Sequence, residues 1–501
     1  MVYPGKRSLG CTLCRERKVK CDERRPGCRR CELYKTQCPG YRRPLEVRFY
    51  FREPEEQIAS MLVVRRSGEC LAPRRASSQA ANSNIQYPTD AIGKSTLRFG
   101  SRRDEESIPY FLAEYSVPPL PGIYSGNLDF LPNLLASSSP TSALWPATHA
   151  SAFLALSRRY KSSQLYDRAR RSYGTALLAV NESLSQPPHT WQDDLVAAIM
   201  LLHRFEDMDG GLLSNRALHM RGIAELYRAR DQNLLSKLPG CSLYSWTFSQ
   251  LQIHAFITHT SYECLIVPEP EPDIKHIPTG FTVLVAKVGR FWSQLTERLT
   301  TLRLNTGTHY EQRQSLVTAL LDAIGIRIDM DKWIESLPVS WKPTTTVKDG
   351  GHIVITYSDQ WLGTIWILYN AVQIIFYHGV LQCCQSILSF QDHNDMTCDE
   401  LIESCRATAE VSLEQLTELV CGSIPYVLGE VDIDGQRLEV PNYKGSHCYN
   451  LIWPLALVAR SDRSTKDQVD LCRKTLANIR AKYGIHLAES AQDVAALLFY
   501  Q

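Results

Sequence analysis

Residues 11–38 read CTLCRERKVKCDERRPGCRRCELYKTQC and carry six cysteines with the spacing C-x2-C-x6-C-x6-C-x2-C-x6-C. The six cysteines are Cys11, Cys14, Cys21, Cys28, Cys31 and Cys38. They form two copies of one C-x2-C-x6-C unit, which predicts two half-sites related by a pseudo-two-fold axis. In each copy, two thiolates three positions apart can hold one metal ion, and the six-residue interval returns the chain to that ion.

The number of ligands limits how many ions this array can hold. A closed structural zinc site takes four ligands, with sulfur at about 2.3 Å from the metal. One zinc would leave two cysteines over, whereas two zincs need eight ligand positions, so two thiolates must bridge. The pseudo-symmetry requires equivalent bridging positions, and Cys11 with Cys28 is one such pair. A disulfide knot and two separate mononuclear zinc sites are the alternatives.

Two further features favour metal over disulfides. The first ten residues are polar and basic, so we expect no signal peptide and therefore an intracellular chain, in which clustered cysteines usually bind metal. A domain of about 30 residues also buries too little apolar surface to fold without help, so the metal would supply its folding free energy. The other ten cysteines are scattered from Cys70 to Cys472, and we interpret them as buried thiols.

Charge is distributed unevenly between the cysteine-rich head and the rest of the chain. Residues 1–52 hold 15 Lys and Arg against five Asp and Glu, whereas the remainder holds 40 basic and 48 acidic residues. A basic head on an acidic body predicts a polyanionic partner for the head alone.

The array resembles the fungal zinc binuclear cluster family. The cysteine spacing, the basic stretch RERKVK (15–20) and Pro26 before the fourth cysteine all fit its pattern, over about 30 of the 501 residues. The resemblance implies two zinc ions per chain, bridged by Cys11 and Cys28, and recognition of CGG-type sites in double-stranded DNA. It also implies a nuclear regulator of RNA polymerase II transcription.

The first half of the array is the more basic one and predicts the DNA-contacting helix. RERKVK carries four basic residues and one acid, whereas its counterpart ELYKTQ carries one of each. A basic helix can enter the major groove, where Lys or Arg commonly donates to guanine. In the family the position of Lys18 is central to reading CGG, and Arg17 lies beside it. The candidates for phosphate contacts are Arg15, Lys20, Arg24 and Arg25.

The rest of the chain predicts a linker and a large helical domain. We divide the chain into the cluster domain (1–45), a partly disordered linker (46–110) and a helical regulatory domain (111–501), a mainly α fold. The predicted helices are 148–184, 193–208, 214–230, 246–265, 281–303, 311–336, 358–390, 399–421, 447–460, 466–483 and 489–500. The clear strand signal is HIVITY (352–357). Segments HMRGIAELYRAR (219–230) and WIESLPVSWKP (333–343) resemble the helical regulatory domain of one branch of the same family.

Two segments bear on partners. Residues 361–388 lack Lys, Arg, Asp and Glu, but Asn370, His378 and three glutamines favour a buried helix over a membrane span, so no membrane partner is expected. Residues 39–65 lack a heptad repeat and contain three prolines, which argues against the coiled-coil dimer common in the family. Monomeric DNA binding and a homodimer formed through the helical body both stay open.

We interpret the chain as a transcription factor, which contacts the transcription machinery and is not an enzyme. No P-loop, GxGxxG, HExxH or GxSxG motif names a catalytic residue. The rivals are a general nucleic-acid or RNA binder and an enzyme whose body converts a small molecule. A metal-buffering protein is disfavoured, because only six of the sixteen cysteines are clustered.

Overall fold

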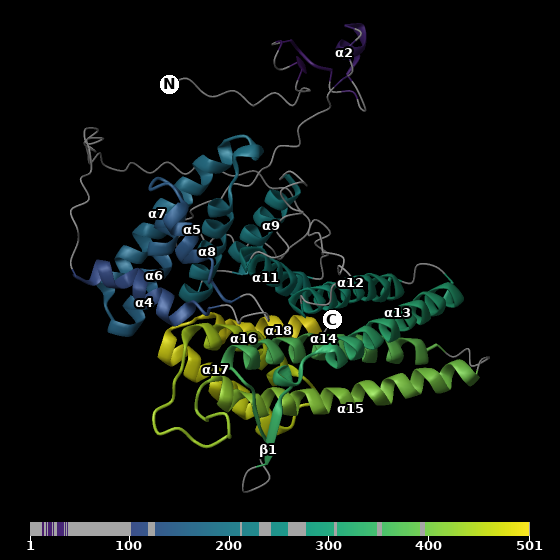
Figure 1. The fold of residues 1–501 in the computed structure, drawn as a ribbon. Coiled ribbons are helices and arrows are strands. Elements are labelled where there is room, and N and C mark those ends of the chain that lie inside the picture. Colours follow the sequence, from purple (N-terminus) through teal and green to yellow (C-terminus); the bar gives the residue numbers. More distant parts are fainter. Residues whose placement is uncertain are drawn as a thin grey trace, which may run out of the picture. The chain divides into compact units, whose positions relative to one another are not determined.

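The computed structural model divides the chain into two compact units, Met1–Arg48 and Phe49–Gln501. The residues that it describes are 13–14, 17, 19–22, 24, 28–34, 36, 38, 102–118, 126–210, 213–229, 242–258, 277–304, 308–347, 353–390 and 396–499. Regular structure in these residues is almost entirely helical (Figure 1). The predicted mainly α fold is therefore confirmed.

The first unit contains the short helix α2 (Arg29–Leu33). The helices of the second unit are α4 (Arg102–Tyr115), α5 (Leu131–Ser137), α6 (Leu144–Tyr160), α7 (Ser163–Ser185), α8 (Asp193–Asp209), α9 (Leu213–Ala229), α11 (Ser242–Thr258), α12 (Ile277–Arg303), α13 (His309–Ser336), α14 (Gln360–Leu388), α15 (Met396–Val427), α16 (Gly445–Arg460), α17 (Lys466–Tyr483) and α18 (Leu487–Phe499), with 3-10 turns at Pro188–Thr190 and Val339–Trp341.

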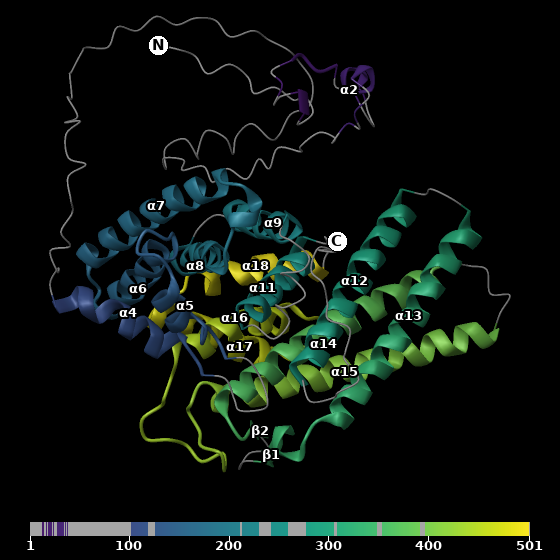
Figure 2. The same cartoon turned by 45° about the horizontal axis from the view of Figure 1, so that its top comes forward.

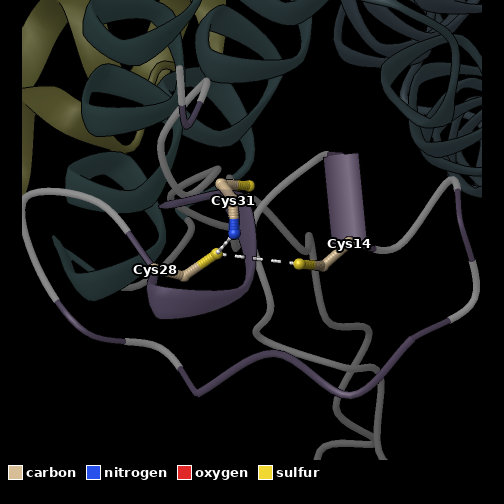
Figure 3. Close-up of side chains that lie close together, drawn as sticks. All are labelled: Cys14, Cys28 and Cys31. Atoms are coloured by element: carbon tan, nitrogen blue, oxygen red, sulfur yellow. Dashed lines mark hydrogen bonds between the residues drawn. The ribbon is translucent and has the colours of Figure 1, made fainter. Parts of the chain in front are cut away.

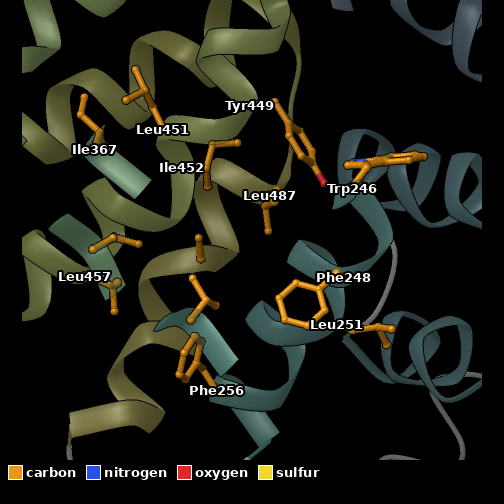
Figure 4. Packing of buried hydrophobic residues seen from close by; sticks show 14 of the residues in the cluster. Trp246, Phe248, Leu251, Phe256, Ile367, Tyr449, Leu451, Ile452, Leu457 and Leu487 are labelled. Carbon is orange, nitrogen blue, oxygen red and sulfur yellow. The ribbon is translucent and has the colours of Figure 1, made fainter. Parts of the chain in front are cut away.

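The long helices of the second unit form two neighbouring hairpins. Helix α12 packs against α13, α14 packs against α15, and α14 contacts both helices of the first pair (Figures 1 and 2). Helix α16 packs against α14, α17 and α18, and its apolar side chains Leu451, Ile452 and Leu457 contribute to the buried core (Figure 4). One large apolar core therefore runs through the described part of the second unit, and Val117, Trp361 and Ile365 form a small separate cluster.

Capping explains where several helices end. The single helix predicted over 148–184 is in fact two, because Lys161 adopts a left-handed conformation (φ 49°) and ends α6. The Ser162 side chain then accepts a hydrogen bond from the Leu165 N–H and starts α7. Gly210 ends α8 in the same left-handed region (φ 91°), as the Gly210-Gly211 pair predicts.

Helix α4 begins at Arg102, inside the segment that the sequence analysis assigns to the linker. Its ordering follows from burial, because the side chains of Phe111 and Tyr115 are 0% and 2% exposed in the core. An apolar series at Ile108, Phe111 and Tyr115 has helical spacing, but the charged residues before it and Pro109 obscure the pattern.

The predicted strand is confirmed and has a partner that the sequence analysis missed. Strand β1 (Thr344–Val347) pairs antiparallel with β2 (Ile353–Thr356), with Thr344 opposite Thr356 and Val347 opposite Ile353. Helix α15 covers β2, which explains how a two-stranded hairpin persists.

Helix α14 contains the apolar segment that could be mistaken for a membrane span. It is the one helix among the described residues that is both long enough and apolar enough to cross a membrane. Its most apolar window of 18 residues has a mean hydropathy of 1.3. However, 78% of that window is buried inside the protein. The prediction of a core helix is confirmed.

Candidate metal centre and nucleic-acid interface

Three of the predicted ligands meet in the first unit. The sulfur atoms of Cys14, Cys28 and Cys31 all lie within 4.8 Å of one another, and the side chains converge as Figure 3 shows. The Cys14 and Cys28 sulfurs are 3.7 Å apart. Cys28 is the N-cap of α2, and its sulfur accepts a hydrogen bond from the Cys31 N–H at 3.4 Å. The x2 spacing thus places two thiols at one helix start.

The geometry of these thiols fits zinc and does not fit a disulfide. A disulfide needs sulfurs about 2.05 Å apart. Two sulfurs that bind one tetrahedral zinc at about 2.3 Å lie roughly 3.8 Å apart, close to the separation of Cys14 and Cys28. The three side chains are only 0–3% exposed, although this small unit has little other core. Zinc chemistry explains why they are gathered and buried here.

Cys28 also belongs to a second group of candidate ligands. Its sulfur lies within 4.8 Å of the Cys21 sulfur and of a carboxylate oxygen of Asp22. A thiolate that bridges two metal ions must lie close to the other ligands of both ions, and Cys28 lies close to both groups of candidate ligands. Cys38 is half-buried against the same cluster. Cys11, the other predicted bridge, lies outside the described residues, so the full set of six ligands stays a prediction.

Asp22 is a neighbour of the metal centre that the sequence analysis did not single out. Besides its approach to Cys21 and Cys28, its Oδ2 accepts a hydrogen bond from the Arg29 N–H at 3.2 Å. It thereby joins the segment after the first half-site to the start of α2. Asp22 directly follows Cys21, the third cysteine of the array, and this position in the sequence could have marked it as a neighbour of the metal centre.

The described DNA-contact candidates are all exposed. They are Arg17, Lys20 and Arg24; Arg15, Lys18 and Arg25 lie outside the described residues. The Arg17 N–H donates to the Leu13 carbonyl at 3.1 Å, and the Val19 N–H donates to the Cys14 carbonyl at 2.9 Å. The Arg17 guanidinium carbon lies 5.4 Å from the centre of the Tyr34 ring, so a cation–π contact helps to orient it.

The structure adds basic residues from the second half-site. Arg29 and Arg30 are exposed at the start of α2, and they line a hollow of about 260 Å³ together with Lys20, Asp22 and Leu33. The sequence analysis compared the two x6 segments and overlooked this pair in the x2 segment between Cys28 and Cys31. The basic surface of the described unit therefore includes both halves of the array.

The second unit contains a buried polar group on α8, which bears on the enzyme alternative. His219 Nε2 lies 3.0 Å from Glu206, and His203 Nε2 lies 3.7 Å from Asp207. Arg204 is fully buried, with its guanidinium carbon 4.3 Å and 4.9 Å from the ring centres of Tyr449 and Tyr115.

His219 and Glu206 pair with each other inside the core, whereas the three guanidinium nitrogens of Arg204 are buried without a hydrogen-bond partner among the described residues. Burial raises the pKa of Glu206, but the His219 partner, the hydrogen bond from Tyr173 and the nearby His203 together leave the pKa below its usual value. None of these groups lines the cavity at Trp246 and Phe281, the cavity at His378 and Arg460, or the hollow at Lys20. The pairing of His219 with Glu206 joins α9 to α8.

Comparisons with known proteins address each unit. Residues 9–47 match the fungal Zn(2)-Cys(6) binuclear cluster domain, and residues 116–413, more than half of the chain, match the fungal-specific transcription factor domain. The matched cluster domain binds two zinc ions. No solved structure matches the chain.

A curated relative matches a short part of the chain. The aspercryptin biosynthesis cluster-specific transcription regulator atnN of Emericella nidulans is 46% identical over 55 residues. That alignment covers 11% of this chain and 9% of the relative. The similarity therefore concerns only a small part of both proteins.

Proposed function

Because the chain belongs to the family of fungal-specific transcription factors, we propose that it is a nuclear, sequence-specific DNA-binding regulator of RNA polymerase II transcription. The observation that carries the proposal is the group of buried thiols at zinc-compatible separations, surrounded by exposed basic side chains. A zinc-fixed scaffold holds such side chains in a defined arrangement, which base recognition requires.

Within the proposed interface, base reading and phosphate contact fall to different residues. Lys18 and Arg17 read guanines of a CGG-type site from the helix after Cys14. Arg15, Lys20, Arg24 and Arg25 contact phosphates and set the position of the domain on the duplex. Exposed Arg29 and Arg30 extend the same basic surface.

The helical body supplies regulation in this proposal. Contacts with the transcription machinery fall to residues 111–501, joined to the cluster domain (1–45) through the segment 46–110. Because the segment after the cluster lacks a heptad repeat, a homodimer would form through the helical body, and monomeric binding is the alternative. A role in catalysis is not proposed, because the buried acids and histidines of α8 do not face a described pocket.

Selection of bound duplexes from a random pool by the full-length protein tests the proposal. We expect enrichment of CGG-type sequences, and competition by unlabelled CGG duplex but not by single-stranded or double-stranded RNA of the same sequence. Equal competition by RNA would instead support the general nucleic-acid binder. Recovery of random duplexes without a shared motif would contradict sequence-specific regulation.

A further inference from the structure

Two thiols of the helical body lie in contact with each other, far along the chain from the cysteine array. The sulfur of Cys421, on α15, is 3.9 Å from the sulfur of Cys472, on α17. The two helices pack against each other, so this contact belongs to the body itself. Neither thiol takes part in the array or in the proposed DNA interface, so the contact calls for an explanation of its own.

The pair differs from the cysteine array in the ligands around it. Among the described residues, no Cys, His, Asp or Glu brings a third ligand atom within 4.8 Å of both sulfurs. A structural zinc ion takes four ligands, so two thiols alone do not hold one. The sulfurs are also too far apart for an existing disulfide, which needs about 2.05 Å. Cys421 and Cys472 are therefore a pair of reduced thiols.

A disulfide between these thiols would join two parts of the body. The sulfurs must approach each other by roughly 1.9 Å, a distance on the scale of a side-chain rotamer change. Helix α15 packs on α14 and β2, whereas α17 packs on α16 and α18. The bond would close a loop of the chain, residues 422–471, that contains α16. It would thereby fasten the C-terminal helices to the hairpin of α14 and α15.

The two thiols differ in how easily a reagent in solution reaches them. The Cys472 side chain is 0% exposed, whereas that of Cys421 is half-buried. The hydrogen bond between the two thiols, together with burial, raises the pKa of Cys472, so this thiol keeps its proton. A small oxidant therefore reacts first at Cys421, and Cys472 lies next to the product of that reaction.

We propose that Cys421 and Cys472 form a reversible disulfide when the protein meets a peroxide. The Cys421 sulfur attacks one oxygen of hydrogen peroxide, the O–O bond breaks, a sulfenic acid forms on Cys421 and water leaves. The Cys472 sulfur then attacks the Cys421 sulfur, the S–O bond breaks and a second water leaves. Two thiols are oxidised by two electrons in total, the peroxide is reduced to water, and each thiol proton ends in a water molecule.

The proposal makes this pair a modification site of the helical body and is independent of DNA recognition by the cluster. Disulfides of intracellular proteins are rare, and those that form are commonly transient and sense oxidants. The pair fits that role, because one thiol is accessible and its partner is close enough to complete the bond.

Peptide mapping of the full-length, zinc-loaded protein tests the proposal. Trypsin separates the two thiols, because residues 407–437 and 467–473 are bounded by Lys or Arg and each contains one cysteine. After treatment with hydrogen peroxide and alkylation of free thiols, mass spectrometry should find these two peptides linked, and dithiothreitol should separate them. Recovery of both peptides alkylated and unlinked, or of Cys421 as a sulfinic acid without the link, would overturn the proposal.

A variant of the second thiol tests the order of the two steps. Cys472→Ser leaves the sulfenic acid on Cys421 without a thiol to react with, so dimedone should label Cys421 after peroxide treatment. We expect at least about tenfold less labelling in the parent, where Cys472 consumes the sulfenic acid. Equal labelling of Cys421 in the parent and in Cys472→Ser would show that the second thiol does not react, and would overturn the proposal.

Thermal unfolding shows whether the new bond restrains the body. Peroxide treatment should raise the unfolding midpoint of the parent, because a cross-link restrains the unfolded chain, and it should not do so in Cys421→Ser. Cys405→Ser removes another half-buried thiol of α15 and is the matched control, so its midpoint should rise as in the parent. An equal rise in Cys421→Ser would overturn the assignment to this pair. If a variant does not fold, the peptide map of the parent decides.

Discussion

Lys18 lies midway between Cys14 and Cys21, two cysteines that bound zinc would hold in place. We expect Lys18→Ala to weaken binding to a CGG duplex by about 1–3 kcal/mol and to affect a scrambled duplex much less. Arg24→Ala is the matched control for a phosphate contact, and it should weaken binding to both duplexes alike. It should also lower by about one unit the slope of the logarithm of the binding constant against the logarithm of the salt concentration. Titrations over a range of salt concentrations measure both effects. If Lys18→Ala weakened binding to the CGG duplex and to the scrambled duplex equally, Arg17 would be the next candidate for reading guanine.

Cys28 and Cys14 differ in how many metal ions they are expected to hold. Cys28 takes part in both ligand groups, so Cys28→Ser should disturb both zinc ions, whereas Cys14→Ser should remove a ligand from only one. Native mass spectrometry of the full chain gives the zinc content, which should be two for the parent. Cys405→Ser, in α15, controls for the loss of a thiol and should retain both ions. A parent that holds one zinc would contradict the bridged cluster.

At the scale of elements, the break between α6 and α7 depends on one strained residue. Lys161 sits in the left-handed region, which costs a residue with a Cβ atom about 1 kcal/mol or more. Lys161→Gly should therefore raise the free energy of unfolding of the body by about 0.5–1 kcal/mol, whereas Lys161→Ala should give no such gain. Urea unfolding followed by tryptophan fluorescence measures this, since all nine tryptophans lie in the second unit. A similar gain from alanine would assign the effect to the lysine side chain instead.

At the scale of the whole molecule, buried histidines predict how stability depends on pH. Burial lowers the pKa of His378 and of His447 to about 4, and each ring hydrogen-bonds a hydroxyl, Ser461 and Thr364 respectively. An unfolded histidine has a pKa near 6.5, so between about pH 6.5 and 4 the unfolded chain binds protons that the folded chain does not. Stability is therefore lost as the pH falls through this window.

The expected loss is about 1 kcal/mol per histidine on going from pH 7.5 to 5.5. Urea unfolding at the two pH values, followed by tryptophan fluorescence, measures it. In His447→Gln the difference between the two pH values should shrink by that amount, whatever the variant does to stability at pH 7.5. An undiminished difference would show that His447 titrates normally in the folded protein.

The sequence by itself determined the metal chemistry and the helical class. Ligand chemistry depends on residue type and spacing, which are local, so the repeated C-x2-C-x6-C unit was enough to predict a two-zinc cluster. The long helices followed for a similar reason, because helical periodicity and stop signals such as Gly210 lie within a few residues of each other. The buried placement of α14 could also be predicted, since its amides and histidine suit a protein interior better than lipid.

Only the tertiary structure decided which distant side chains meet. The sequence could not show that Gln252 of α11 lies beside Gly289 of α12, or that Arg204 is held between Tyr115 and Tyr449, because contacts across the core depend on how the helices pack. The start of α4 was missed for the same reason, since burial of Phe111 and Tyr115 against the body orders a segment whose own sequence is weakly patterned. Side-chain packing between elements, which no local pattern encodes, is the physical source of these features.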